Sequence, residues 1–369
     1  MKIIFFCGSL EPGRDGVGDY CRSMAAELIK LGNAVKLVAL NDRYIEDTLD
    51  QNEKFNNVQI DILRFSHRER SKILLEIINK LTNNFQPDYS SLQYVPYAYH
   101  IKGLPISLGR FLSKIKNAGK WQAMIHEPFI EASKHQTIKE KFLRQLQIIC
   151  LRSILKKIRA EVIHTSIPFY MDRLAEQGIN SKLLSLFGNI KIVVDINTAN
   201  TRKIDPSHLK AIYFGSAPEE ARQSIFAEKI RIYCEENNAA IEILICGKNG
   251  PHGGRFISEI ENICRDVSCK ILLLGEKNES EISNLFMKSD FGISRNSPEF
   301  VEKSGSSISM LEHGLPLWIP ITRADTFFSN LKFRPELCFE NLSAISQISR
   351  GSMCPQLSKI TKQFLNDIS

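Results

Sequence analysis

Short apolar runs alternate with longer amphipathic segments along the 369 residues of the chain. The first run, Lys2–Cys7, is followed by a glycine-containing loop and then by a segment, 20–31, whose apolar residues recur at the spacing of one helical face. Later apolar runs have the length and composition of buried strands. Strands that alternate with helices are typical of parallel sheets covered on both faces. The pattern therefore predicts an α/β protein.

The alternation occurs twice and predicts two consecutive doubly wound domains, 1–190 and 205–350. A polar segment, 187–206, is the expected hinge, and a last helix within 355–369 is expected to pack back on the first domain. In the first half the expected strands are 34–40, 58–65, 92–96, 121–126, 160–165 and 182–186, and the expected helices are 68–85, 137–157 and 170–177. In the second half the expected strands are 210–214, 241–246, 270–274, 290–294 and 315–319, and the expected helices are 219–235 and 279–288.

Composition narrows the class of protein. With 43% hydrophobic and 24% charged residues, the chain has the composition of an ordinary soluble protein. Its nine cysteines include no Cys-x-x-Cys pair, which favours reduced thiols, and the first apolar run is too short for a signal peptide, so we expect a cytoplasmic protein. A net charge of +7 without interleaved aromatic and basic motifs does not favour nucleic acid. Since neither an Asp-x-Asp pair nor a His/Cys cluster with ligand spacing occurs, we expect no metal and no cofactor.

The most informative stretch runs from Ser294 to Pro320. It combines a strand end, a polar loop, a helix that begins near Ser304–Ser307, a stop at Gly314 and a buried strand. The first amides of a helix lack partners within the helix and carry the positive end of its dipole. Serine and glycine at this position would let a phosphate approach those amides closely. The alternative is that the serines only cap a structural helix.

Charged residues near this helix indicate a nucleotide-sugar. Lys303 and Arg295 can add positive charge beside a diphosphate, whereas Glu302 suits sugar hydroxyls better than phosphate. A second set of candidates, His126 and Glu127, follows an expected strand at its carboxyl end, where ligands of open α/β sheets bind. A purely structural histidine is an equal alternative for the first of them.

Five segments resemble, in sequence order, the motifs of retaining glycosyltransferases of the glycosyltransferase family 4 type (glycosyl transferases group 1). They are Gly16-Val-Gly-Asp-Tyr20, Gln93-Tyr-Val-Pro-Tyr97, His126-Glu-Pro128, Leu274-Gly275 with Glu281-Ile-Ser, and Glu302-Lys-Ser-Gly305 through Gly314-Leu-Pro316. This resemblance implies the GT-B fold, in which two Rossmann-like domains face each other across a cleft. The first domain would receive the acceptor and the second would hold the nucleotide-sugar donor.

The resemblance and the residues themselves together predict roles for individual side chains. The expected catalytic residues are His126, Glu127 and Glu302, with His126 touching the donor sugar. The expected donor-binding residues are Gly16, Gly18, Gly275, Arg295, Lys303, Ser304, Gly305, Ser306, Ser309 and Glu312. The sequence departs from the family pattern at two places. Ser309 occupies the position of the second family glutamate, and the Arg and Lys pair that usually holds the diphosphate in that family is missing after 210–214. Arg222 is a further available cation, and the run from Glu302 to Ser306 also resembles the sugar-phosphate loop of glycogen-phosphorylase-like enzymes.

The implied function is a hexosyltransferase-like enzyme that moves a sugar from a nucleotide-diphosphate sugar to an acceptor hydroxyl, with retention, in polysaccharide or glycoconjugate synthesis. The alternatives are a nucleotide-sugar epimerase of the same fold, a non-catalytic sugar-nucleotide-binding protein and an inactive descendant. Basic residues beside apolar ones over 102–120 and 139–157 fit an anionic membrane surface or a solvated helix face. We therefore expect a sugar or lipid-linked acceptor and a peripheral contact with the inner membrane leaflet.

Overall fold

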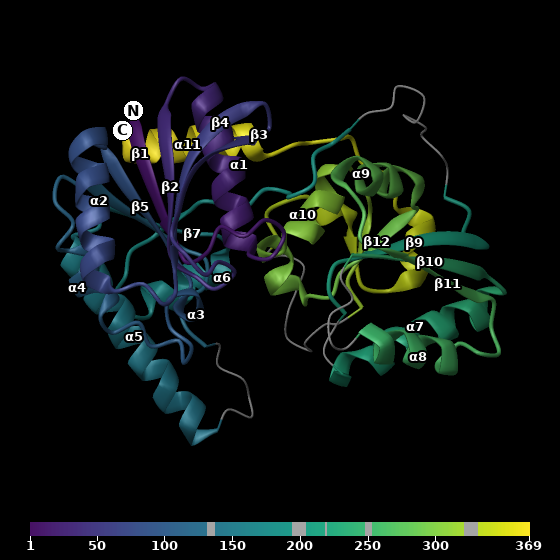
Figure 1. The fold of residues 1–369 in the computed structure, drawn as a ribbon. Helices are drawn as coiled ribbons and strands as arrows, with labels where there is room; N and C mark the ends of the chain where they lie inside the picture. The colour runs from purple at the N-terminus through teal and green to yellow at the C-terminus, as the bar shows by residue number, and fades with distance from the viewer. Residues whose placement is uncertain (131–136, 194–203, 218–219, 248–252, 321–330) are drawn as a thin grey trace. The chain divides into compact units, whose positions relative to one another are not determined.

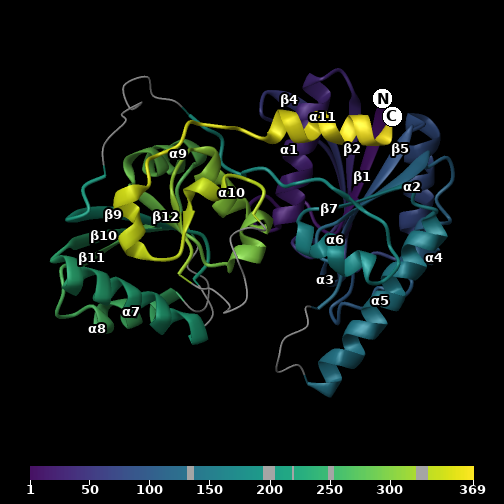
Figure 2. The same ribbon diagram turned by 180° about the vertical axis from the view of Figure 1, so that it is seen from behind.

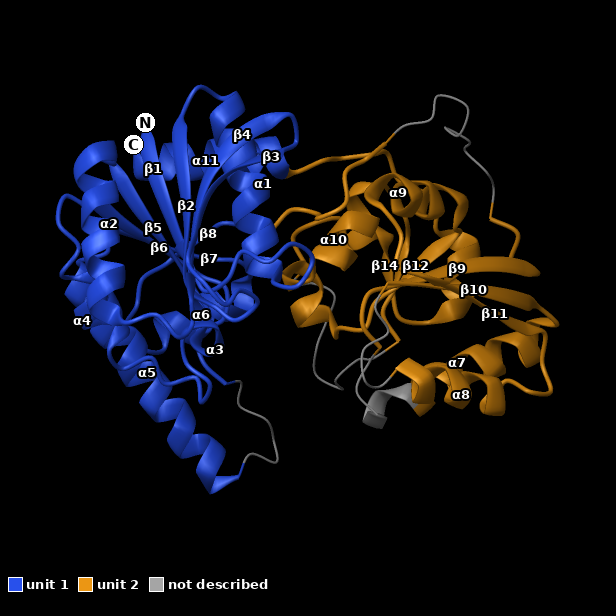
Figure 3. Ribbon diagram, viewed as in Figure 1, with its two compact units in different colours: residues 1–185, 357–369 blue, residues 186–356 orange. Residues whose placement is uncertain are grey.

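The computed structural model describes residues 1–130, 137–193, 204–217, 220–247, 253–320 and 331–369. The chain divides into two compact units (Figure 3). Unit 1 consists of residues 1–185 and 357–369, and unit 2 consists of residues 186–356. Of the predicted hinge, 187–206, the part over 194–203 lies outside the described residues.

Unit 1 is built on an eight-stranded sheet (Figure 1). In spatial order its strands are β3 (Leu49–Phe55), β4 (Val58–Ser66), β2 (Ala34–Asp42), β1 (Lys2–Cys7), β5 (Tyr89–Tyr94), β6 (Lys120–Ile125), β7 (Val162–Thr165) and β8 (Lys182–Leu183). All neighbouring strands run parallel except β3 and β4, which pair antiparallel. The strand order reverses between β1 and β5, which lie side by side.

Helices cover both faces of this sheet (Figures 1 and 2). One face is covered by α2 (Ser71–Phe85), α4 (Leu108–Leu112) and α5 (Ile138–Ile158), and the other by α1 (Gly16–Lys30) and α11 (Leu357–Ile368); α3 (Pro96–Tyr99) and α6 (Pro168–Ala175) complete the unit. Ile4 and Phe6 of β1 belong to the core under the first set of helices. Phe5 points the other way and contacts Phe364 of α11, with ring centroids 5.9 Å apart. Both faces are covered, so the strand is apolar throughout rather than alternating.

The edge strand β3 is absent from the sequence prediction. Its residues, Leu-Asp-Gln-Asn-Glu-Lys-Phe, show almost no apolar pattern, because a solvated edge strand needs none. Phe55 pairs with Val58, so Asn56 and Asn57 form a two-residue turn, and both have positive φ (51° and 65°). This is the backbone that a tight hairpin requires and that asparagine tolerates. The Asn-Asn pair was thus the available signal for the hairpin.

Unit 2 contains a six-stranded sheet whose neighbouring strands are all parallel. In spatial order its strands are β11 (Cys269–Gly275), β10 (Ala240–Cys246), β9 (His208–Phe214), β12 (Phe291–Ile293), β13 (Leu317–Trp318) and β14 (Cys338–Phe339). Ile243 and Ile245 of β10 face a core shared with α7 (Glu220–Asn237) and α8 (Gly253–Ile263). Leu244 and Cys246 face a second core shared with α9 (Glu279–Lys288) and α10 (Gly305–Glu312).

The predicted α/β class, with two doubly wound parallel sheets, is confirmed. Besides β3, the sequence prediction lacks α3, α8 and β14. Helix α8 begins with two glycines, which are poor helix formers, and β14 is only two residues long. The largest shift concerns α1, which begins at Gly16 and not at Tyr20.

Metal-ligand clusters, membrane-spanning helices and disulfides are three features that could change the expected function. No group of three or more His, Cys, Asp or Glu side chains within these ranges could hold a metal ion. Among the helices of the same ranges, none has the length and apolar character needed to cross a bilayer. The nine cysteines all lie in described segments and are free thiols.

Two glycines that follow helices allow a matched test of close backbone packing. Gly32 and Gly314 both have positive φ (82° and 70°), but a side chain at Gly32 would meet nothing within 4 Å. A Cβ at Gly314 would overlap the carbonyl oxygen of Gly351. We expect Gly32→Ala to lower the free energy of unfolding by about 1–2 kcal/mol through backbone strain alone. Gly314→Ala should lower the free energy of unfolding by several kcal/mol more, because the backbone near Gly351 must also move.

Urea denaturation of both variants measures the difference. Equal losses of stability would show that the segment near Gly351 yields easily and that its packing against α10 is loose.

Candidate active site

The sheet of unit 2 reverses its strand order between β9 and β12. These strands run parallel in register, with Ile293 paired to Tyr213, so their carboxyl ends meet at one edge. Ligands of open α/β sheets bind outside the carboxyl ends of the strands at such a reversal. Gly215 follows β9 and Arg295 follows β12, so both residues border the expected ligand position.

Three neighbouring strands of this sheet end in glycines with positive φ. Gly215, Gly247 and Gly275 have φ values of 122°, 112° and 65°. Their backbones are linked, since the amide of Gly215 donates to Cys246 (3.0 Å) and that of Gly247 donates to Gly275 (2.9 Å). Gly275 was predicted from sequence, whereas the other two were missed. The available signal was a glycine directly after each buried apolar run.

Helix α10 begins at this edge, as predicted. Ser304 is its N-cap, and the Ser304 Oγ accepts from the amide of Ser307 (3.3 Å). The intrahelical pattern starts with the amide of Ile308, which donates to the carbonyl of Ser304 (2.9 Å). The amides of Gly305 and Ser306 therefore belong to the helix end whose N–H groups have no partner within the helix. Ser304, Gly305 and Ser306 are half-buried, which leaves them within reach of a bound molecule.

Ser306 connects this helix end to the end of β9. A Cβ at Gly215 would lie 3.9 Å from the Ser306 Oγ, and the Ser306 and Ser304 hydroxyls lie 2.9 Å apart. Two serine hydroxyls, two helix amides and a glycine backbone thus surround one small region. Groups of this kind bind phosphate without a metal ion.

Two predicted cations lie near this region. Lys303 is half-buried and ends a 3-10 helix over Pro298–Lys303 directly before α10. Arg295 is exposed. Burial raises the pKa of the Tyr213 phenol, at the carboxyl end of β9, and the nearby charge of Arg295 opposes that shift. The side chain of Arg222, the third cation that the sequence offered, lies outside the described part of the chain.

Glu302 is buried and already bound to the backbone. Its Oε1 accepts from the amides of Lys332 (2.6 Å) and Phe333 (2.5 Å). Burial raises the pKa of its carboxyl, and the two amide bonds limit the rise. The predicted contact with sugar hydroxyls would have to coexist with these bonds. The structure thus gives Glu302 an anchoring role that the sequence did not indicate.

The side chains of Ser309 and Glu312, predicted as donor ligands, contact the backbone near the start of unit 2. Both side chains are buried. The Ser309 hydroxyl lies 3.0 Å from the Asn189 side chain and accepts from the amide of Ile190 (3.1 Å). The Glu312 Oε1 accepts from the amides of Gly188 (2.9 Å) and Gln356 (3.2 Å). Their role as donor ligands stays a prediction and would have to coexist with these bonds, which hold the backbone at the start and end of unit 2.

The remaining predicted residues belong to unit 1. His126 follows β6, is buried, and its Nε2 lies 2.8 Å from the Gln93 Oε1. The ring of Tyr20 packs edge-on against it, with centroids 5.0 Å apart. The backbone amide of Glu127 points to the carbonyl of Tyr94 (3.4 Å), and its side chain is half-buried. His126 and Glu127 therefore lie at the carboxyl edge of this sheet, next to the end of β5, as the sequence predicted.

Gly16 and Gly18 lie within the first turn of α1 rather than before it. The Asp15 carboxylate caps this helix and accepts from the amides of Val17 (2.9 Å) and Gly18 (3.0 Å). A Cβ at Gly18 would lie 2.7 Å from the carbonyl oxygen of Ser9, so glycine is needed for packing. The predicted contact of Gly16 and Gly18 with the donor stays a prediction, and the amide of Gly18 is already bound to the Asp15 carboxylate.

Comparisons with known proteins address the fold. Neither a protein-family model nor a curated protein matches the sequence. Sucrose-phosphate synthase from Thermosynechococcus elongatus aligns with 100% of this chain and 94% of its own, with a TM-score of 0.59 and 14% identity. Anabaena HepE, in complex with UDP and glucose, aligns with 99% of this chain and 98% of its own, with a TM-score of 0.52 and 13% identity.

A third solved structure is the catalytic domain of starch synthase IV from Arabidopsis thaliana, bound to ADP and acarbose. It aligns with 100% of this chain and 92% of its own, with a TM-score of 0.51 and 11% identity. These similarities show that the chain has the GT-B fold. The narrower resemblance to glycosyltransferase family 4 stays a prediction.

The buried Glu312 predicts a pH dependence of stability. Burial raises the pKa of its carboxyl to about 7, although the amides of Gly188 and Gln356 oppose the shift. Between the ordinary glutamate pKa and about pH 7, the folded state holds a proton that the unfolded state has lost. The free energy of unfolding should therefore fall as pH rises through this window, by about 3 kcal/mol from this group.

Glu312→Gln keeps a carbonyl that can accept both amides and removes the titration. We expect urea denaturation at pH 5 and pH 8 to show a smaller loss of stability in this variant than in the wild type. Burial lowers the pKa of His164 and of His313, and these groups act in the opposite sense in both proteins, so the difference between the proteins isolates Glu312. Identical pH profiles would contradict the raised pKa.

Proposed function

We propose that this chain is a glycosyltransferase that moves a sugar from a nucleotide-diphosphate sugar to an acceptor hydroxyl. The observation that carries the proposal is the start of α10, where Ser304–Ser306 and Lys303 surround an accessible helix end at the strand-order reversal of the sheet. Two solved structures of the same fold contain ADP with acarbose and UDP with glucose. We extend this ligand class, a nucleoside diphosphate next to a sugar, to the present chain.

The chemistry of the site fits a diphosphate leaving group. As the bond to the sugar breaks, negative charge grows on the departing diphosphate, and fixed donors aimed at that charge lower the barrier. The amides at the start of α10 and the hydroxyls of Ser304 and Ser306 are such donors, and Lys303 supplies a full positive charge. They would take over the task of the Arg and Lys pair that the sequence lacks after β9. Retention of configuration and a place in polysaccharide or glycoconjugate synthesis follow from the family resemblance.

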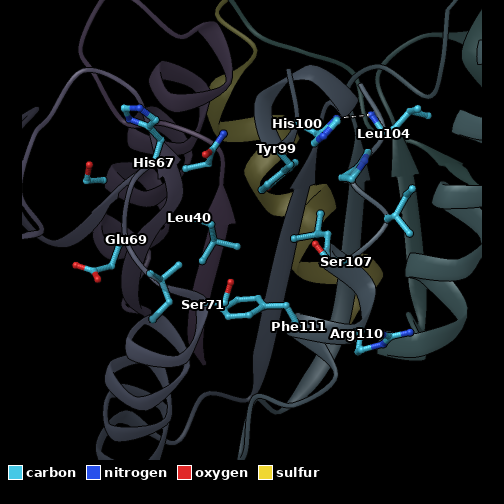
Figure 4. A pocket seen from close by; sticks show the side chains of 16 residues that line it. Leu40, His67, Glu69, Ser71, Tyr99, His100, Leu104, Ser107, Arg110 and Phe111 are labelled. Carbon is cyan, nitrogen blue, oxygen red and sulfur yellow. Dashed lines mark hydrogen bonds between the residues drawn. The ribbon is translucent and has the colours of Figure 1, made fainter. Parts of the chain in front are cut away.

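The acceptor would bind in unit 1, which has a pocket at the carboxyl ends of β2 and β4 (Figure 4). The pocket has a volume of about 430 Å³. Leu40, His67 and Glu69 line one side, and Tyr99, His100 and Arg110 line the other. Apolar walls with a few polar groups are typical of small-molecule sites. The mixture of aromatic, imidazole and charged groups suits a sugar or a phosphate-linked sugar.

The rim of this pocket favours an acceptor that is linked to a lipid. Ile101 and Ile106 are 76% and 75% exposed, and the exposed Lys102 and Arg110 lie beside them in sequence. Exposed isoleucines next to basic residues suit an anionic membrane surface, where each basic residue contributes about 1 kcal/mol. Lys120, which the sequence also offered, forms an ion pair with Glu161 (3.0 Å). We therefore centre the proposed membrane contact on 101–110.

The first test concerns the donor. Isothermal titration with UDP-, GDP-, ADP- and dTDP-sugars should identify one nucleotide that binds. Lys303→Ala should weaken that binding by about 1.5–3 kcal/mol, the contribution of a charged hydrogen bond. Lys288→Ala is the control, because this exposed lysine ends α9 in the same unit.

Unchanged affinity in Lys303→Ala would exclude this lysine from the donor site. Absence of binding by every nucleotide in the panel would contradict the proposed function itself. Incubation of the bound donor alone distinguishes an epimerase, which would convert the sugar without any acceptor.

The second test concerns the membrane. The wild type should co-sediment with anionic phospholipid vesicles at low salt and less at high salt. The double variant Ile101→Ser, Ile106→Ser should bind at least roughly tenfold more weakly, since burying one isoleucine contributes about 1.5–3 kcal/mol. Ile232→Ser, at a 42% exposed position in unit 2, is the control. Wild-type protein that stays in solution at low salt would leave a soluble acceptor as the only possibility.

A further inference from the structure

A continuous chain of buried polar side chains crosses the sheet of unit 1, starting at the candidate catalytic histidine. Its members come from three neighbouring strands, the residue that follows β6, and helix α11. In order, they are His126, Gln93, Ser91, Gln122, His164 and Asp367. The first five are buried, and the Asp367 side chain is 19% exposed.

The contacts along the chain are all within hydrogen-bonding distance. The His126 Nε2 lies 2.8 Å from the Gln93 Oε1, and the Gln93 Nε2 donates to the Ser91 Oγ at 2.6 Å. The Ser91 hydroxyl donates to the Gln122 Oε1. The Gln122 Nε2 lies 3.0 Å from the His164 Nδ1. The His164 Nε2 lies 3.1 Å from Asp367 Oδ2, and Lys182 donates to Asp367 Oδ1 at 2.8 Å.

These polar residues occupy the sheet face that α11 covers. Ser91 and Gln93 alternate along β5 with Leu92 and Tyr94, which belong to the core on the opposite face. Ser91 is also the register partner of Gln122 on β6. Buried polar groups without partners cost about 1–3 kcal/mol each, so a row of them persists when each one bonds to the next. The arrangement is therefore a connected network and not a set of separate polar residues.

The network has a defined direction because one end is a carboxylate. An ionised carboxylate only accepts hydrogen bonds. The bonds from Lys182 and His164 outweigh burial and keep the pKa of Asp367 below its ordinary value, so this group is ionised near neutral pH. Burial lowers the pKa of His164, which is therefore neutral and carries one ring proton. That proton must be on Nε2, facing Asp367.

The direction of hydrogen-bond donation set at Asp367 also holds for the other bonds of the row, as far as His126. With its proton on Nε2, His164 accepts at Nδ1 from the Gln122 amide, whose oxygen then accepts from Ser91. Ser91 in turn accepts from the Gln93 amide, whose oxygen faces the His126 Nε2. Every donor points from His126 toward Asp367. If every hydrogen bond in this row ran the other way, the side-chain amides of Gln93 and Gln122 would both be flipped and the ring proton of His126 would be on Nδ1.

We propose that Asp367 is a positioning residue that fixes the tautomer of His126, with the proton on Nε2, through this row of hydrogen bonds. The C-terminal helix α11 thereby sets which nitrogen of His126 carries a proton, although its carboxylate does not touch that ring. The relevance to catalysis rests on the function proposed above, whereas the tautomer is a property of the free protein and can be measured without substrate.

The test uses NMR of full-length protein with ¹⁵N-labelled histidine, at a pH where His126 is neutral and with its signals assigned by His126→Gln. In the wild type, long-range ¹H–¹⁵N correlations should show that Nε2 of His126 carries the ring proton and that Nδ1 is unprotonated. Asp367→Asn has nearly the same shape, but its amide can donate or accept, so the direction of the chain is no longer fixed. Both ¹⁵N shifts of His126 should then move toward their average, in opposite directions.

Three further variants separate this effect from damage to the fold. Ser91→Ala breaks the chain in the middle and should release the tautomer, and Ser91→Thr, which keeps the hydroxyl, should restore it. Lys182→Ala leaves the Asp367 carboxylate in place and should retain the wild-type shifts. A wild-type proton on Nδ1 would overturn the proposal, as would a fixed Nε2 proton in Asp367→Asn. If the shifts change as expected but no donor sugar is ever transferred, the proposed function fails and the positioning role stands.

Discussion

The buried carboxylate of Glu312 holds the chain at both ends of unit 2. That unit begins at Leu186 and ends at Gln356, and Glu312 accepts amides from Gly188 and Gln356. The backbone of Gly188 lies so close to the Glu312 side chain that a Cβ at Gly188 would be 2.8 Å from the Glu312 Oε2. Glu312 ends the same short helix, α10, whose first turn is the candidate anion site. The candidate anion site and the contacts with both ends of unit 2 therefore belong to one eight-residue helix.

Electrostatics explain why the candidate donor site belongs to this helix and not to α1. Both helices begin near the carboxyl edge of their sheet, where the strand order reverses. Helix α1 is capped by the carboxylate of Asp15, which accepts from the amides of Val17 and Gly18, and Asp19 lies in its first turn, so an anion at this helix end would meet two acidic side chains. Helix α10 is capped by the neutral Ser304 and preceded by Lys303. A neutral cap therefore favours phosphate at the start of α10 over the start of α1.

The sequence predicts the sheets well because a strand covered on both faces is mostly apolar, and that is a local property of the chain. It predicts the start of α10 for the same reason, since the serine cap and the glycine lie within a few residues. The contacts of Ser309 with Ile190 and of Glu312 with Gly188 could not be predicted, because these partners lie more than a hundred residues away in sequence and no local pattern records such contacts. The row of hydrogen bonds from His126 to Asp367 was not predicted for the same reason, because its members are far apart in sequence. Polar residues at alternate positions of a buried strand were the available signal.

The central claim is that a nucleoside diphosphate binds at the start of α10, and backbone NMR tests it most directly. The amide signals of Gly305 and Ser306 would be compared in free protein and in protein saturated with UDP, GDP, ADP or dTDP. The nucleotide that binds should shift these two amides more than those of Gly16 and Gly18. Shifts at the start of α1 without any at α10, or no response to all four nucleotides, would contradict the account.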